Sequence, residues 1–152
     1  MSDIAFARSL HVFAIVVWIG GVSMVTTILL PAFKRHFPVD KRLDMFQQIE
    51  YRFAMQARWL VFVAGLSGFY MVWRLKLWDR FEQLSFWWMH AMVLVWVLFA
   101  SMLFVIEPFF MDKKRAEDAK RNPVQTYKRV QRMHWIFLLL SIVTLLGAVW
   151  GN

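Results

Sequence analysis

The sequence predicts an all-α integral membrane protein, folded as a four-helix up-down bundle in a single transmembrane domain that covers residues 1–152. Three observations predict this fold class. Hydrophobic residues make up 60% of the chain, against about 45–50% in soluble domains. The apolar residues are gathered into four runs, and most lysines and arginines lie between these runs. A soluble core of this size cannot use so much apolar surface, whereas a bilayer can.

The four runs predict spans at about 9–33, 54–75, 85–106 and 133–151. A helix needs about 20 residues to cross a bilayer, so the first and third runs qualify outright and the fourth nearly does. The apolar centre of the second run, Trp59–Trp73, is short. Phe53–Ala57 extends it inward, with Arg58 facing the bundle or reaching the interface. The first run has no basic segment before it and no cleavage site, so we expect a retained helix rather than a signal peptide.

The distribution of positive charge predicts the orientation of the spans. Fourteen of the 18 lysines and arginines lie in the segments 32–58 and 107–132. By the positive-inside rule, these segments contain cytoplasmic loops, at 34–53 and 107–132, and both termini lie outside. The expected location is the bacterial inner membrane. Helical spacing of apolar residues over Asp44–Arg58 indicates that the first loop is partly a helical extension, and Asn122-Pro123 marks a break before the fourth helix.

The composition also excludes several classes of site. The chain has no cysteine, which excludes disulfides, thiolate metal sites and cysteine-ligated iron–sulfur clusters. The net charge of +8 is confined to the loops, so it indicates contact with anionic lipid rather than nucleic acid. Glu107 and Asp112 lie at the inner end of the third run, where we expect them to be too shallow for a proton path.

Three of the four histidines, His11, His90 and His134, lie in or at the edge of the predicted spans. An ionisable residue in a span predicts a functional site, because its desolvation is costly. Neutral imidazole is a good ligand for heme iron, zinc or copper. His11 and His90 both fall in the outer half, at heights that differ by roughly 5–7 Å at 1.5 Å per residue. His134 lies about 20 Å lower by the same rise and is a second-site candidate. His36, in a basic loop, is not expected to be a ligand.

The sequence therefore predicts a heme b site with His11 and His90 as the metal ligands. Arg8 lies one turn before His11 and could pair with a heme propionate. Trp18 lies on the same helical face as His11, and Gly21 allows close backbone approach. The alternative for these residues is structural: the histidines are simply hydrogen-bonded, and the glycines pack helices together.

Three stretches of the chain resemble the CopD/HemJ superfamily of small bacterial membrane proteins. They are Leu10-His11 with Trp18-Ile19-Gly20-Gly21, then Glu50-Tyr51-Arg52-Phe53, and Trp88-Met89-His90-Ala91-Met92-Val93-Leu94. The resemblance implies heme b and protoporphyrinogen IX oxidase activity for HemJ-like proteins, in which the first-helix histidine is important. For CopD-like proteins it implies copper uptake or resistance. Met92 stands where HemJ proteins have lysine, so the resemblance supports heme more than it supports the oxidase reaction.

Four functions follow as hypotheses. The first is a small b-type cytochrome that transfers electrons, with quinone as a partner, as a homo-oligomer or as a subunit of a larger membrane complex. The second is a HemJ-like oxidase acting on a porphyrinogen. The third is a copper protein that uses Met89, His90 and Met92 as soft or borderline ligands. The fourth is a cofactor-free membrane subunit. No catalytic residue is assigned.

Overall fold

The computed structural model describes residues 3–111, 117, 118 and 121–151, and it is all-α. The first long helix comprises α1 (Asp3–Met24), the π-helical segment η1 (Val25–Leu29) and α2 (Leu30–His36); the second is α3 (Val39–Arg74). The short 3-10 segments η2 (Trp78–Glu82) and η3 (Leu84–Phe86) lead into α4 (Trp87–Ser101), which continues as the π-helical segment η4 (Met102–Met111). The last helix is α6 (Pro123–Trp150). The predicted four helices are thus present.

The break between the first two helices is much shorter than the predicted loop 34–53. Two prolines explain the position of this break and the π-helical segment that precedes it. Pro31 has no amide hydrogen to donate to the carbonyl of Thr27, and the widened π turn of η1 ends just before it. Phe37 is extended (φ −117°, ψ 143°) because it precedes Pro38. The chain is helical again from Val39, so the helical extension predicted over Asp44–Arg58 is present and begins earlier than expected.

Three of the helices are long and apolar enough to cross a membrane: Asp3–His36, Leu84–Glu107 and Pro123–Trp150. These three candidate spans indicate a multi-pass membrane protein. The fourth helix begins at Pro123, directly after the predicted break. Residues 112–116 and 119–120 of the predicted loop 107–132, with Asp112 among them, lie outside the described residues.

The helix α3 is not among these candidate spans, and its apolar stretch between Arg58 and Arg74 is short. Its second half nevertheless presents a continuous apolar face to the surroundings. Side chains at intervals of three and four residues share this face and are each more than half exposed: Trp59, Phe62, Leu66, Phe69 and Trp73. A large exposed apolar patch of this kind marks a surface that lies against lipid or a partner.

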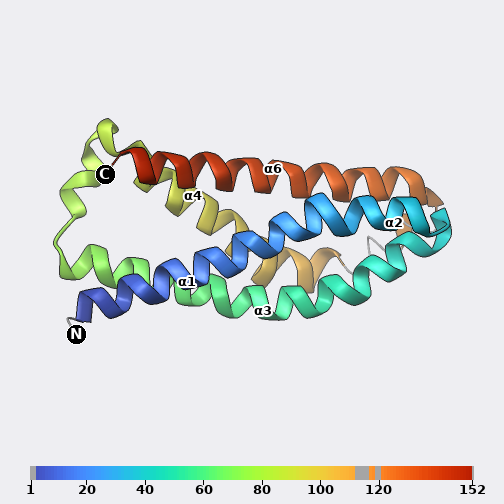
Figure 1. Ribbon diagram of the computed structural model, residues 1–152, viewed down its shortest axis with the longest axis horizontal. Helices are drawn as coiled ribbons and strands as arrows, with labels where there is room; N and C mark the ends of the chain where they lie inside the picture. Colours follow the sequence, from blue (N-terminus) through green and yellow to red (C-terminus); the bar gives the residue numbers. More distant parts are fainter. Residues whose placement is uncertain (1–2, 112–116, 119–120, 152) are drawn as a thin grey trace.

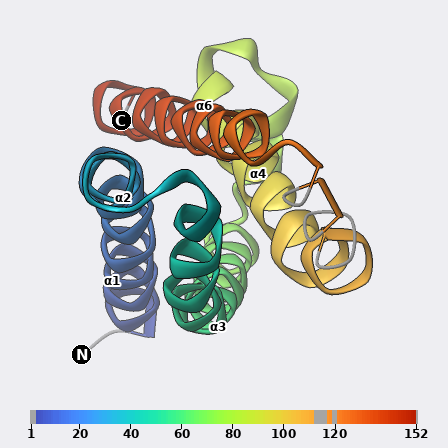
Figure 2. The same ribbon diagram turned by 90° about the vertical axis from the view of Figure 1, so that its right-hand side faces the viewer.

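The bundle has two distinct ends (Figure 1). The start of α1, the end of α6 and the turn between α3 and α4 lie at one end, which we call the termini end. The connection from α2 to α3 lies at the other, which we call the Pro38 end. Viewed along the bundle, α1 and α4 lie on opposite sides, separated by α3 and α6 (Figure 2).

The helices form two closely packed pairs. The first pair, α1 and α3, is joined at the termini end by Asp3, which accepts hydrogen bonds from Tyr70 Oη (2.8 Å) and Arg74 Nε (3.1 Å). The second pair is α4 and α6, in which Gly147 and Gly151 make room for the indoles of two tryptophans, Trp87 and Trp88. Because α4 crosses obliquely from α6 toward α3, η4 closes the bundle from the other side (Figure 1).

Candidate functional site

His11 is held against α3 in a defined orientation. Its Nδ1 lies 2.8 Å from the carbonyl oxygen of Ala64 and 3.2 Å from Ser67 Oγ. Since the Ser67 hydroxyl also lies 2.6 Å from the carbonyl of Val63 and can donate to it, and since a carbonyl can only accept, Nδ1 carries the hydrogen and donates it to Ala64. In the neutral ring the lone pair is therefore on Nε2. Ligating histidines commonly have this arrangement, with one nitrogen donating to a backbone carbonyl and the other free to bind metal.

Gly68 permits this close contact between α1 and α3. A Cβ at this position would lie 3.0 Å from His11 Cε1, closer than an ordinary van der Waals contact. The glycine that matters to His11 is therefore on the facing helix. Gly21, which the sequence suggested for the cofactor site, instead makes room for the ring of Phe53, and a Cβ there would lie 2.2 Å from Phe53 Cε2. Gly21 thus packs helices together.

His90 is turned toward a different part of the molecule. Its Nε2 lies 2.9 Å from the carbonyl oxygen of Phe81 in η2, and its ring meets the Phe81 ring edge-on at 5.5 Å between centroids. The residue is exposed, while its neighbour Met89 is buried. Consecutive residues on a helix diverge by about 100°, so Met89 and His90 do not point toward a common centre.

The structure does not bring the two predicted ligands together. His11 contacts α3 and His90 contacts η2, although both lie toward the termini end. Arg8 is exposed one turn before His11. Trp18 is buried in a separate site, where its ring meets Phe99 edge-on. Within the described part of the chain, no group of three or more His, Asp or Glu side chains could hold a metal ion.

All four long helices contribute to a cavity of about 60 Å³, which we call the interior pocket. The residues that line it are ordered along the axis of the bundle. Toward the Pro38 end lie three titratable side chains, Glu50, Glu107 and His134, which we call the polar floor. Toward the termini end lie three aromatic rings, Trp18, Phe99 and Phe137, which we call the aromatic cover.

Glu50 and His134 face each other on the polar floor. Glu50 Oε1 lies 3.9 Å from His134 Nε2, and the two side chains are 15% and 12% exposed. The other imidazole nitrogen, Nδ1, donates to the carbonyl of Val130 one turn earlier (3.0 Å), and Phe46 meets the ring edge-on. The helix and Phe46 therefore fix the ring so that Nε2 faces the carboxylate of Glu50.

A second ion pair lies beside the first. Arg58 Nη2 is 3.8 Å from Glu107 Oε2, and Arg58 Nε donates to the carbonyl of Leu103 at 3.0 Å. Arg58 thus faces the bundle, one of the two alternatives that the sequence left open. Residues 102–111 form the π-helical segment η4, and such segments often occur at functional sites.

The sequence reasoning missed most of this site. It treated His134 as a second-site candidate without a partner histidine, and it expected Glu107 to be too shallow for a proton path. Glu50 was noted only within a motif, Glu50-Tyr51-Arg52-Phe53. The structure divides this motif: Glu50 and Phe53 line the interior pocket, whereas Tyr51 and Arg52 are exposed. The sequence did carry one signal for this site, namely glutamates that interrupt an otherwise apolar helical pattern.

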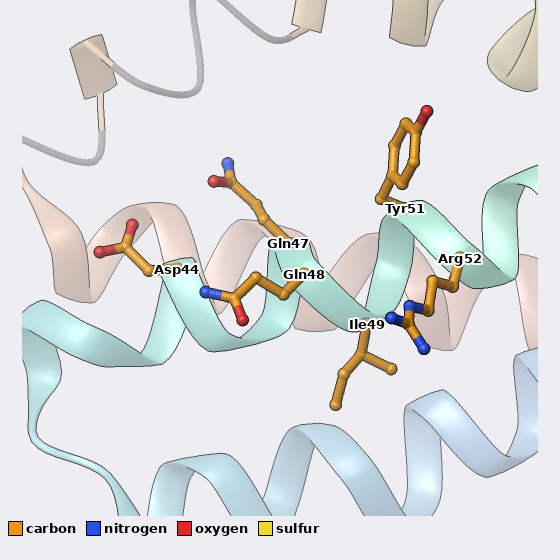
Figure 3. A pocket seen from close by; sticks show the side chains of 6 residues that line it. All are labelled: Asp44, Gln47, Gln48, Ile49, Tyr51 and Arg52. Carbon is orange, nitrogen blue, oxygen red and sulfur yellow. The ribbon is translucent and has the colours of Figure 1, made fainter.

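A shallow hollow of about 820 Å³ lies over the first half of α3 (Figure 3). The residues that line it all come from one stretch of this helix: Asp44, Gln47, Gln48, Ile49, Tyr51 and Arg52. In Figure 3, Ile49 points away from Tyr51 and Gln47 instead of converging with them. The hollow is therefore an open helix surface without the convergent polar groups of a binding site.

Comparison with protein-family models, with curated proteins and with solved structures found no match. The function of the chain is therefore argued from its own residues.

Proposed function

We propose that the chain is a heme-b-binding redox protein of the bacterial inner membrane, in which His11 is an axial ligand of the iron. The orientation of the His11 ring carries this proposal. Its Nδ1–H is committed to Ala64, so Nε2 is the nitrogen available to a metal. Heme b, when bound, supplies one-electron redox chemistry, and the surrounding protein sets its potential.

The proposal includes four spans, with both termini outside. The exposed apolar face of α3 between Trp59 and Trp73 supports the second half of α3 as the fourth span, since lipid would cover it. The excess of lysine and arginine in the segments 32–58 and 107–132 supports a cytoplasmic location for the Pro38 end. In this orientation His11 lies in the outer half of the membrane.

The protein holds its own side of this site with three groups. Ala64 orients the imidazole, Gly68 lets the ring approach α3, and Arg8 lies one turn outward, where its charge can meet a carboxylate. His90 is the residue that would supply the second ligand. Ligation through its Nε2 requires the ring to give up the hydrogen bond to Phe81.

The test is the spectrum of the purified protein in mild detergent, oxidised and reduced, for the wild type and three variants. We expect His11→Ala to lose heme. We expect His90→Ala to retain it with the spectrum of a five-coordinate iron, if His90 is the second ligand. His36→Ala is the matched control, because His36 is exposed in the basic region and should leave the spectrum unchanged. Full heme content in His11→Ala would refute the proposal.

The same preparation distinguishes the remaining hypotheses. A colourless protein with copper in stoichiometric amount would indicate a copper protein. A colourless and metal-free protein that is well folded would indicate a cofactor-free membrane subunit.

A further inference from the structure

We propose that the interior pocket is a hydrated proton-binding site, in which Glu50 and His134 share a proton that enters from the Pro38 end of the bundle. This inference does not depend on heme, because the pocket is separate from His11 and His90. The ligands of this site, which all four long helices form, are a proton and the water molecules around it.

The size and lining of the pocket suit water. A volume of about 60 Å³ corresponds to about two water molecules at roughly 30 Å³ each. Buried water also needs two to four polar partners, and the polar floor supplies them. In addition, the indole Nε1–H of Trp18 is buried without a hydrogen-bond partner among the described residues. Trp18 is only 3% exposed, so an acceptor such as water would relieve a costly unsatisfied donor.

The facing pair is arranged to hold one proton between its two members. Because Nδ1 of His134 is committed to Val130, any exchangeable proton resides on Nε2 or on the Glu50 carboxylate. The 3.9 Å between Nε2 and Oε1 is longer than a direct hydrogen bond and is a distance at which a bridging water is expected. Moving the proton from one group to the other converts an ion pair into two neutral groups, and burial keeps these two states close in energy.

Among the described residues, the charged groups around this pair come from α3, η4 and α6. From α3 come Glu50 itself and Arg58, from η4 comes Glu107, and α6 contributes His134. Within the described residues, α1 adds no charge to the pocket, only Trp18 and an apolar neighbour. Arg58 lies against Glu107 and the carbonyl of Leu103. One fixed ion pair therefore stands beside the pair that exchanges the proton.

The order of residues along the helices determines the side of access. The polar floor is at the Pro38 side on α3, η4 and α6, whereas the aromatic cover closes the opposite side. Trp18 and Phe99 meet at 4.7 Å, and Phe99 and Phe137 at 4.8 Å between ring centroids. Val61, one turn beyond the pocket on α3, is fully buried. The termini side of the pocket is therefore closed, and we place proton uptake on the Pro38 side.

The first test measures the charge state of His134 by NMR of protein labelled with ¹⁵N-histidine, over a range of pH. With only four histidines, His134→Gln assigns the signal. We expect Glu50→Gln to displace the titration midpoint of His134 by about one pH unit or more, as for the loss of a charge within about 4–6 Å. Glu82→Gln, in the exposed turn, is the matched control and should leave it in place. If Glu50→Gln left the titration midpoint of His134 unchanged, the proposal that the two residues share a proton would be overturned.

The second test measures hydration and its side, and it benefits from a chain without cysteine. Ala54 and Ala14 are both buried, at 3% and 0% exposure, but only Ala54 lines the pocket. Silver ion, a small water-borne thiol reagent, should react much faster with Ala54→Cys than with Ala14→Cys in membrane vesicles. It should do so from the Pro38 side only. If silver ion reacted with the two cysteines at the same rate, the pocket would not be hydrated. If it reacted equally from both sides of the membrane, access would not be one-sided.

Discussion

The ion pair between Arg58 and Glu107 gives the sharpest test of how η4 is held in the bundle. It joins the second half of α3 to the π-helical segment η4, and Arg58 also donates to Leu103 on the same segment. Replacing each charged residue by an apolar one of similar length, Arg58→Met and Glu107→Leu, removes the pair stepwise. A double-mutant cycle then isolates the interaction between the two charges, because the loss of the bond to Leu103 appears in both arms.

The expected magnitude follows from distance and exposure. Two unit charges 3.8 Å apart attract by about 4 kcal/mol at an effective dielectric constant of about 20. Desolvation opposes this attraction, and the side chains are 27% and 17% exposed, so water screens part of it. We therefore expect a coupling energy of about 1–2 kcal/mol. Each single substitution should destabilise the protein, because it removes one member of a partly buried ion pair.

The assay is reversible unfolding in mixed detergent micelles, followed by circular dichroism, for the wild type, both single variants and the double variant. A coupling energy within about 0.5 kcal/mol of zero would refute the reasoning, since this is the usual error of additivity. The matched comparison is the pair formed by Asp3 and Arg74 at the termini end. Its side chains are 52% (Arg74) and 47% (Asp3) exposed, so its coupling should be weaker and should fall more steeply with added salt.

Two further substitutions test single contacts. Gly68→Ala would place a methyl group 3.0 Å from His11 Cε1; it should displace the ring, shift the His11 NMR signal and cost about 1 kcal/mol of stability. Gly20→Ala is its control, because nothing lies within 4 Å of a Cβ there, and equal effects of the two would contradict the close contact. Tyr127→Phe removes the donor to the buried carbonyl of Leu30 and should lower the free energy of unfolding by about 1–3 kcal/mol. A variant as stable as the wild type would show that this carbonyl has another donor.

The helices could be predicted from the sequence because their signals are local. Apolar runs and the break at Asn122-Pro123 depend only on neighbouring residues, and the structure has its last helix beginning at Pro123. The start of α3 at Val39 was not predicted, because charged residues are as compatible with a helix that extends out of the apolar region as with a loop. Within this segment, the break at Phe37-Pro38 has a local cause, which is the restriction that proline imposes on the residue before it.

The interior pocket could not be predicted because its contacts join distant parts of the chain. Glu50 and His134 are far apart in sequence, and no spacing rule relates a residue of one helix to a residue of another. The π-helical turns add to this, since the period of 3.6 residues does not apply within η4. By contrast, the place of His11 in a helix was a local signal, although its contact with Ala64 was not.

The division of the bundle into two helix pairs has a mechanical consequence. Asp3, Tyr70 and Arg74 tie α1 to α3 at one extremity, and the tryptophan–glycine contacts tie α4 to α6. Sliding of one pair past the other would break the contacts that join them, such as the hydrogen bond from the Trp96 indole to the carbonyl of Val61 and the ion pair of Arg58 with Glu107. The space between the pairs is thus fixed by the contacts between them as well as by those within each pair.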